Sequence, residues 1–206
     1  MTAAVTPKGE RRRYALVRAA AELLCEGGFG AVRHRAVAQR AGLPLASTTY
    51  YFASLDDLIV SAVNEAGMLE IAQLRSRVNA LPRRRRGSQA IADVLVDLLV
   101  GERDGARLGA GLISRYERYI ACARQPALRD IHLRLLRQRT EAVVEVLDRS
   151  GRSVRAEQLS AMVCAVDGAV IAALVDERQD PRKTARSAVL SVIDAVAPYP
   201  QHAAGF

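Results

Sequence analysis

The polar side chains best placed for chemistry lie between residues 33 and 52, and their types suit binding to nucleic acid. Arg33, His34 and Arg35 precede a short apolar pattern, and a hydroxyl-rich run at 47–51 follows Gly42. Guanidinium groups and hydroxyls donate hydrogen bonds to phosphate oxygens and to base edges. The sequence contains no GxxxxGK[ST], HExxH or GxSxG motif. We therefore expect a binding function and no catalytic residue.

Positive charge is concentrated in the same part of the chain. The sequence carries 30 Lys and Arg against 22 Asp and Glu, a net charge of +8, and residues 1–53 alone hold eight basic and three acidic side chains. Four arginines at 83–86 form a second basic cluster, which we expect to be a solvated linker. A basic segment on a near-neutral body predicts a polyanionic partner.

Composition excludes several classes of protein. Half of the 206 residues are hydrophobic, a quarter are charged and only 4 % are aromatic, which favours a folded helical protein. The longest nearly apolar run, 163–175, contains Asp167, and we expect it to be too short to span a bilayer. No signal peptide is predicted. Three widely spaced cysteines, Cys25, Cys122 and Cys164, predict buried thiols in a reducing cytoplasm and no metal site or cofactor.

The elements that must position these side chains are helices. Apolar residues recur at i, i+3, i+4 and i+7 in successive segments, and no segment alternates as a strand would. The pattern predicts an all-α fold of about nine helices, near 10–26, 34–40, 44–50, 54–78, 88–101, 106–124, 127–149, 155–178 and 182–196.

Two short segments carry turn and capping signals. Gly42 separates two short helical patterns, which is typical of a helix-turn-helix, and Pro44 suits the first turn of the second helix. Gly27 and Gly28 should end the first helix. Ser54, followed three residues later by a carboxylate, predicts a capping box at the start of the long helix.

The stretch from residue 33 to residue 58 reads RHRAVAQRAGLPLASTTYYFASLDDL, and it resembles the DNA-binding module of the TetR family of bacterial transcription regulators. The detailed resemblance covers about residues 10–65. It implies an N-terminal three-helix DNA-binding domain at 8–53, with the helix-turn-helix at about 33–52. It also implies a C-terminal helical ligand-binding and dimerisation domain at 54–200.

The second helix of such a motif enters the major groove and presents its N-terminal residues to base edges. The resemblance implies DNA contacts by Arg33, His34, Arg35, Leu45, Ala46, Ser47, Thr49, Tyr50 and Tyr51. An N-terminal DNA-binding arm would comprise Lys8, Arg11, Arg12 and Arg13. Arg35 is the candidate for a guanine contact. Thr48 and Phe52 are expected in the core.

The C-terminal half carries a predicted dimer interface and a predicted ligand pocket. Small residues form one stripe of the helix at 155–178, which permits close approach of a second copy. The predicted interface comprises Ala161, Ala165, Gly168, Ala172, Val189, Val192 and Ile193. The candidate pocket residues are Leu112, Ile113, Tyr116, Glu117, Ile120, Met162 and Asp167.

Together these features predict a homodimeric, sequence-specific DNA-binding regulator. We expect a repressor that a small-molecule ligand releases from a palindromic operator in double-stranded DNA. Two alternatives stay open: a sequence-nonspecific nucleic-acid-binding protein and an all-helical enzyme. A footprint that protects a palindrome would favour the regulator, and uniform protection would favour the nonspecific binder.

Overall fold

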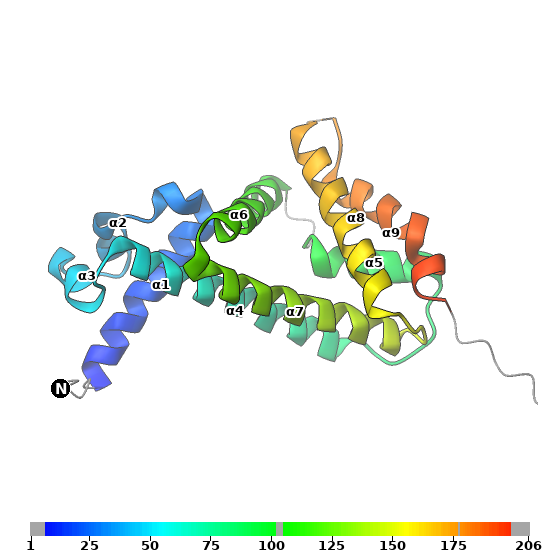
Figure 1. Cartoon of the computed structure of the whole chain (residues 1–206), viewed down its shortest axis with the longest axis horizontal. Helices are drawn as coiled ribbons and strands as arrows, with labels where there is room; N and C mark the ends of the chain where they lie inside the picture. The colour runs from blue at the N-terminus through cyan, green and yellow to red at the C-terminus, as the bar shows by residue number, and fades with distance from the viewer. Residues whose placement is uncertain (1–6, 102–104, 177, 199–206) are drawn as a thin grey trace, which may run out of the picture. The chain divides into compact units, whose positions relative to one another are not determined.

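The structure is a computed structural model that describes residues 7–101, 105–176 and 178–198, and every regular element in these ranges is an α-helix (Figure 1). The nine helices are α1 (Pro7–Ala31), α2 (His34–Arg40), α3 (Leu45–Tyr51), α4 (Leu55–Ala80), α5 (Ser88–Leu99), α6 (Gly105–Arg124), α7 (Pro126–Arg149), α8 (Ala156–Val175) and α9 (Pro181–Val196). The predicted all-α fold is confirmed.

The chain packs as two compact units. The first comprises Met1–Glu70 and Ala110–Leu135, and the second comprises Ile71–Gly109 and Leu136–Phe206. Three helices, α4, α6 and α7, contribute one part to each unit. Packing therefore divides the chain differently from the expected boundary at residue 53. The functional domains 8–53 and 54–200 stay a prediction, and residues 199–200 lie outside the described ranges.

The core of the first unit forms around α1. This helix contributes the apolar stripe that the sequence pattern predicts, including Leu16, Ala20 and Leu24, each with no exposed surface. Val37 of α2 and Leu58 of α4 join the same core. Burial of these side chains supplies the stability that helices as short as α2 and α3 lack by themselves.

Local signals set two of the helix ends in the first unit. Gly27 and Gly28 leave helical geometry, with a φ of +66° at Gly28, so α1 breaks where the glycine pair predicts an end. One further turn follows the break and reaches Ala31. The hydroxyl oxygen of Ser54 accepts a hydrogen bond of 3.1 Å from the backbone N–H of Asp57. The predicted cap at the start of α4 is therefore confirmed.

In the second unit α9 packs against both α8 and α5. The Arg186 guanidinium donates hydrogen bonds of 2.6 Å to Asp93 and to Gln89 of α5. One turn earlier, Arg182 pairs with Asp97. The side chain of Asp180 accepts hydrogen bonds from the first backbone amides of α9 and caps that helix. Charged side chains thus fix the alignment of α9 along α5.

Of the four arginines at 83–86, Arg83, Arg84 and Arg85 are exposed, as a solvated linker requires, whereas Arg86 is buried. The backbone N–H of Arg84 donates to the carbonyl of Arg149 at 2.9 Å, and that of Arg86 donates to the carbonyl of Ser150 at 3.2 Å. The Arg86 side chain is 5 % exposed and donates to the carbonyl of Pro82 at 2.8 Å. Burial lowers the pKa of this guanidinium from its ordinary value. The segment is a strap over the end of α7, because carbonyls at a helix C-terminus need outside donors.

The expectation of buried thiols is wrong for two of the three cysteines. Cys122 is buried in the first core, whereas Cys25 and Cys164 are exposed. Both exposed cysteines lie in helices, and composition cannot distinguish an exposed helical position from a buried one. Cysteine behaves as a small apolar residue that either face accommodates.

Among the described residues, α8 is long and apolar enough to cross a membrane by length and composition, contrary to the expectation for this segment. The qualifying stretch is Glu157–Val175, of which 28 % is buried. Interior and interface helices of soluble proteins meet the same criterion, so this evidence is weak. The carboxylate of Asp167 in its middle is paired with Arg139.

A candidate nucleic-acid interface

The turn between α2 and α3 is built around a left-handed glycine. Gly42 has a φ of +64°, a conformation that side chains with a Cβ rarely adopt. Its N–H donates to the carbonyl of Gln39, and the N–H of Leu43 donates to the carbonyl of Ala38 at 3.0 Å. The Leu43 side chain packs against the core of the first unit. The turn is therefore hydrogen-bonded to α2 and held against the core by Leu43, and it fixes the angle between α2 and α3.

The inner side of α3 is locked into the core. Thr48 has no exposed surface, and its hydroxyl donates to the carbonyl of Leu45 at 2.8 Å. Phe52, directly after the helix, is 4 % exposed and belongs to the same core. Both residues lie where the sequence predicts, and they leave the opposite side of α3 free.

The outer side of α3 carries most of the predicted DNA-contacting residues. Leu45 is 53 % exposed and Tyr50 is 81 % exposed. Ala46 and Thr49 are also exposed, while Ser47 is partly buried. An apolar leucine and a tyrosine with this much free surface on a seven-residue helix favour an external partner over a packing role.

Tyr51 differs from its neighbour Tyr50. Its ring is partly buried and packs against the core, and it meets the Tyr50 ring edge-on at 4.8 Å between centroids. The partly buried ring of Tyr51 therefore supports the exposed ring of Tyr50. A contact of Tyr51 with DNA stays a prediction.

The start of α2 presents two cationic side chains. Arg33 and Arg35 are exposed, and within the described residues neither guanidinium group makes a hydrogen bond or an ion pair. His34 is half-buried between them, and its Nδ1 atom has no hydrogen-bond partner among the described atoms. No side chain caps the start of α2 or of α3. The first turns of both helices therefore carry backbone amides that no side chain caps, although the Ser47 amide of α3 donates to the carbonyl of Pro44 at 2.9 Å.

Two other arginines in this unit are already engaged. Arg40, at the end of α2, donates to the Glu26 carboxylate at 2.8 and 3.0 Å. These bonds hold the pKa of Glu26 below its ordinary value. Arg18 and Arg40 each lie 3.5 Å from Glu22. The positive charge left for an anionic partner is therefore at the start of α2 rather than at its end.

The predicted N-terminal arm is part of a helix. Because α1 begins at Pro7, the four basic residues of the arm lie in its first two turns rather than in an extended segment. Lys8, Arg11 and Arg12 share one exposed face at the spacing i, i+3, i+4. Arg13 points elsewhere: its guanidinium carbon lies 5.1 Å from the centre of the Phe52 ring. Sequence reasoning placed all four residues in one group, and the structure separates Arg13 from the others.

The predicted pocket residues are divided between the two units. Leu112, Ile113, Tyr116, Glu117 and Ile120 belong to the first unit, and Met162 and Asp167 belong to the second. Leu112, Tyr116 and Met162 are buried, whereas Ile113 and Ile120 are at least half exposed. The Asp167 carboxylate accepts hydrogen bonds of 2.9 and 3.1 Å from Arg139. The predicted ligand pocket stays a prediction.

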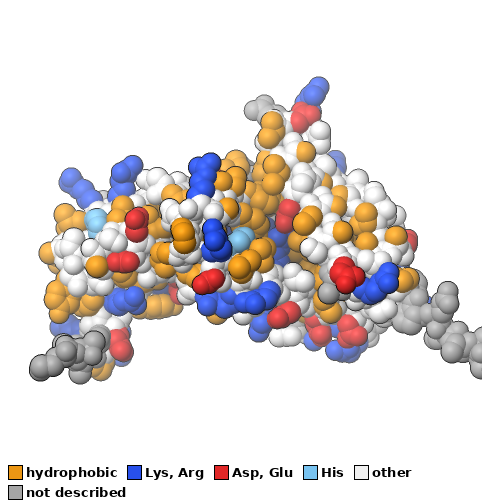
Figure 2. All heavy atoms as spheres, in the orientation of Figure 1, with side chains coloured by type: hydrophobic (Ala, Val, Ile, Leu, Met, Phe, Trp, Pro, Cys, Tyr) orange, Lys and Arg blue, Asp and Glu red, His pale blue; other side chains and the backbone are white. Residues whose placement is uncertain are grey.

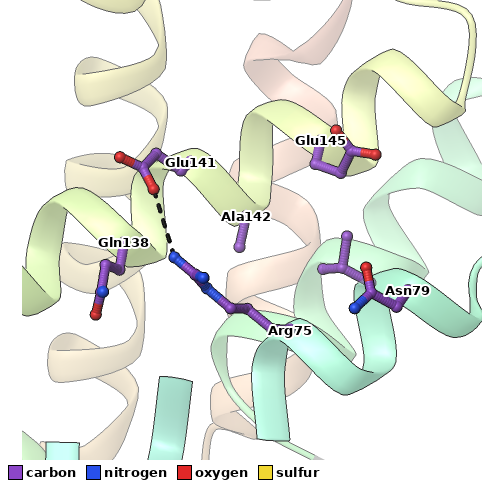
Figure 3. Close-up of a pocket in the computed structure, with 7 residues that line it drawn as sticks. Arg75, Asn79, Gln138, Glu141, Ala142 and Glu145 are labelled. Carbon is purple, nitrogen blue, oxygen red and sulfur yellow. Dashed lines mark ion pairs between the residues drawn. The ribbon is translucent and has the colours of Figure 1, made fainter. Parts of the chain in front are cut away.

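A cavity that sequence reasoning missed lies in the second unit between α4 and α7 (Figure 3). Its volume is about 260 Å³, and its lining residues are Arg75, Val78, Asn79, Gln138, Glu141, Ala142 and Glu145. Arg75 of α4 extends toward Glu141 of α7, at 3.7 Å (Figure 3). No local sequence pattern could have signalled it, because its lining comes from two helices that are far apart in the sequence. None of the predicted pocket residues lines this cavity.

The predicted dimer residues of α8 and α9 lie in different surroundings. Ala161, Gly168 and Ala172 are exposed, and Ala165 is half-buried. Figure 2 shows hydrophobic side chains gathered along α8. Val189 and Ile193 have no exposed surface within the single chain, since they face its own core. These two residues therefore hold α9 against its own chain and cannot contact a second copy. Val192 is half-buried.

Comparison with protein families identifies both parts of the chain. Residues 86–195 match the family described as tetracyclin repressor-like, C-terminal domain. Residues 16–62 match the family described as bacterial regulatory proteins, tetR family. No curated protein matches the chain.

Solved structures resemble nearly the whole chain. The multidrug binding protein EbrR in complex with imidazole is 29 % identical, with a TM-score of 0.62 over 94 % of this chain and 97 % of that one. A transcriptional regulator from Streptomyces coelicolor A3(2) is 27 % identical, with a TM-score of 0.63 over 88 % and 98 %. A regulator from Rhodococcus sp. Rha1 is 19 % identical, with a TM-score of 0.67 over 91 % and 98 %, and shares the fold.

Proposed function

The chain belongs to the TetR family of bacterial regulatory proteins, and we propose on this basis that it regulates transcription by binding one specific DNA sequence through α2 and α3. The observation that carries the proposal is the two-sided construction of these helices. Thr48 and Phe52 lock their inner side into the core, while Leu45 and Tyr50 are largely exposed on the outside. Such an arrangement holds a short helix rigidly enough to enter a major groove.

Base contacts would come from the beginnings of the two helices. Leu45 and Ala46 can touch a thymine methyl group, and Ser47 can donate to or accept from several bases. Arg35 has no competing carboxylate and suits the two acceptors of guanine. These side chains would decide which sequence is bound.

Phosphate contacts would surround these base-contacting residues. The candidates are Arg33, His34, Thr49, Tyr50 and Tyr51 near the motif, and Lys8, Arg11 and Arg12 on the exposed face of α1. Contacts of this kind add affinity without sequence preference and make binding sensitive to salt.

We also propose a homodimer formed through α8. The small residues Ala161, Gly168 and Ala172 are exposed on a helix of which most is apolar and unburied. A two-fold dimer through this face would present two copies of α3 to a palindromic operator. An operator in double-stranded DNA agrees with a cytoplasmic site of action.

A small organic ligand would control the proposed repressor. EbrR has been solved with proflavin and with ethidium, at 29 % identity to this chain in both cases. We propose that a ligand bound to the C-terminal part favours a conformation that cannot hold the operator. DNA must then weaken ligand binding by the same factor by which the ligand weakens DNA binding.

The test of DNA recognition is selection of bound duplexes from random DNA, followed by footprinting. Recovery and protection of one palindrome supports a sequence-specific regulator. Uniform protection without sequence enrichment overturns it in favour of a nonspecific binder.

Ligand binding is tested separately by the thermal unfolding of the DNA-free protein with proflavin or ethidium. A concentration-dependent rise in Tm supports a site for such compounds. An unchanged Tm at saturating concentrations contradicts a ligand class like that of EbrR and leaves the DNA proposal unaffected.

A further inference from the structure

Arg13 is exposed, but it lies at the edge of the helix face by which α1 packs into the core. It precedes Leu16, Val17 and Ala20 by three, four and seven residues, the spacing of one helix face, and all three are buried. Its guanidinium carbon is 5.1 Å from the centre of the Phe52 ring, within the range of an attractive cation–π contact. The charge of Arg13 therefore covers the edge of the core, on a different face from Lys8.

The ring under Arg13 is attached to the last turn of the helix proposed to read DNA. Phe52 ends α3 with extended backbone angles, and its N–H donates to the carbonyl of Thr48 at 3.0 Å. A shift of the Phe52 ring would move this last turn, because the residue is 4 % exposed and has little free space. Arg13 is thus coupled to the direction of α3.

The neighbouring helix is held by α1 in a comparable way. Arg40, the last residue of α2, is bonded to Glu26 of α1 through both of its terminal nitrogens. Both helices of the motif are therefore fastened to α1 at their C-terminal ends. Their N-terminal ends, with Arg35 and Leu45, stay exposed.

We propose that Arg13 is a positioning residue that sets the orientation of α3 through Phe52, and that it does not bind phosphate as its neighbours do. The inference rests on the proposed function, because orientation of α3 matters only if this helix reads DNA. It also divides the basic cluster of α1 into two roles, with phosphate binding left to Lys8, Arg11 and Arg12.

The experiment compares Arg13→Ala with Arg12→Ala, the adjacent arginine that shares a helix face with Lys8 and is proposed to bind phosphate. Affinity is measured on the selected duplex and on a random duplex over a series of salt concentrations. Arg12→Ala should weaken binding to both duplexes and reduce the salt slope by about 0.9. Arg13→Ala should leave the slope unchanged and weaken binding to the selected duplex alone, by roughly two- to fivefold.

Two further variants test the chemistry of the contact. Arg13→Lys keeps a cation above the ring and should restore most of the preference for the selected duplex, whereas Arg13→Gln should not. Equal weakening on both duplexes with a reduced slope would show that Arg13 binds phosphate, and the proposal would be wrong. An unchanged preference in Arg13→Gln would overturn it as well.

Hydrogen exchange of the DNA-free protein separates this inference from the proposed function. Arg13→Ala should accelerate exchange of the Phe52 amide, which is bonded to Thr48, and leave the amides of α9 unchanged. This result can be obtained even if no duplex is preferred. Unchanged exchange at the end of α3 would overturn the coupling between Arg13 and Phe52, whatever the protein binds.

Discussion

The hydroxyl of Ser114 in α6 donates a hydrogen bond of 2.8 Å to the backbone carbonyl of Leu24 in α1. The acceptor lies in the last helical turn before the break at Gly27, where carbonyls lose their helical donors. Ser114 itself is 4 % exposed, and the guanidinium of Arg118 lies beside it. A helix from the second half of the sequence thus completes the hydrogen bonding of the first helix.

Replacement of this hydroxyl should destabilise the protein. Ser114→Ala leaves the buried Leu24 carbonyl without its donor, and we expect a loss of about 1–3 kcal/mol in the free energy of unfolding. Ser191→Ala is the matched control, because its hydroxyl bonds to the carbonyl of Ser187 at an exposed site. Urea denaturation measures both. Equal losses in the two variants would contradict a special role for the buried bond.

Arg35 and Arg40 should differ in their effect on DNA recognition. Arg35→Ala should weaken binding by about 1–3 kcal/mol at one base pair and relax the preference there. Arg40→Ala should show no selective loss at one base pair, because Glu26 already binds this guanidinium and any loosening of α2 would affect all positions together. Competition with single-base variants of the selected duplex measures both effects. Loss of affinity that is equal on selected and random DNA would exclude base reading by Arg35.

The turn glycine should be sensitive to a single methyl group. A Cβ at position 42 would meet no atom within 4 Å, so the penalty of Gly42→Ala comes only from the φ of +64°. We expect a loss of about 1–2 kcal/mol in the free energy of unfolding. Gly30→Ala, where the space is also open and φ is ordinary, should be neutral or stabilising. Thermal unfolding of the two variants shows whether backbone conformation alone makes this difference.

A larger side chain at position 168 should separate the proposed dimer. Gly168 is exposed and a Cβ there would meet nothing within 4 Å in its own chain, so we expect the isolated subunit to accommodate Gly168→Leu. Leucine has a higher helix propensity than glycine, which is about 0.8–1 kcal/mol less favourable than alanine, so the subunit should not be destabilised. Sedimentation equilibrium should show weaker self-association than in the wild type. The same substitution at Gly111 of α6, which also has open space, is the control.

The C-terminal helix should loosen in acid. The Asp194 carboxylate accepts hydrogen bonds of 2.7 Å from Ser88 and from Arg152, and these bonds hold its pKa below the ordinary value of 3.8. Because the pKa is lowered on folding, the carboxylate stabilises the folded state at pH values above its ordinary pKa. This stabilisation is lost as the pH falls through the lower pKa of the folded state. The Tm difference between wild type and Asp194→Asn should therefore be constant near neutrality and shrink below about pH 4. A Tm difference that is the same near neutrality and below about pH 4 would exclude this linkage.

Much of the fold was predictable because the sequence signals of a helix lie within the helix itself. Each predicted helix lies within a few residues of an observed one, since the periodicity of apolar residues acts within one or two turns. The left-handed Gly42 and the cap at Ser54 were visible for the same reason. The exposed Arg35 and the buried Thr48 also lie as the helix-turn-helix pattern predicts.

Contacts between distant segments were decided only by the tertiary structure. The Arg86 side chain donates to the carbonyl of Arg149 and to the hydroxyl of Ser150, which lie 63 and 64 residues further along the chain. No local pattern distinguishes it from a solvated arginine. In sequence Arg13 is indistinguishable from its basic neighbours, and only the folded chain places its guanidinium over the Phe52 ring. Val189 looked like an interface residue and faces its own core.

The sequence by itself thus determined which segments are helical and which face of each is apolar. It could not determine what covers that face, because the hydrophobic effect rewards burial against any partner equally. The packing of the folded chain determines which groups surround Arg13, Arg86 and Val189.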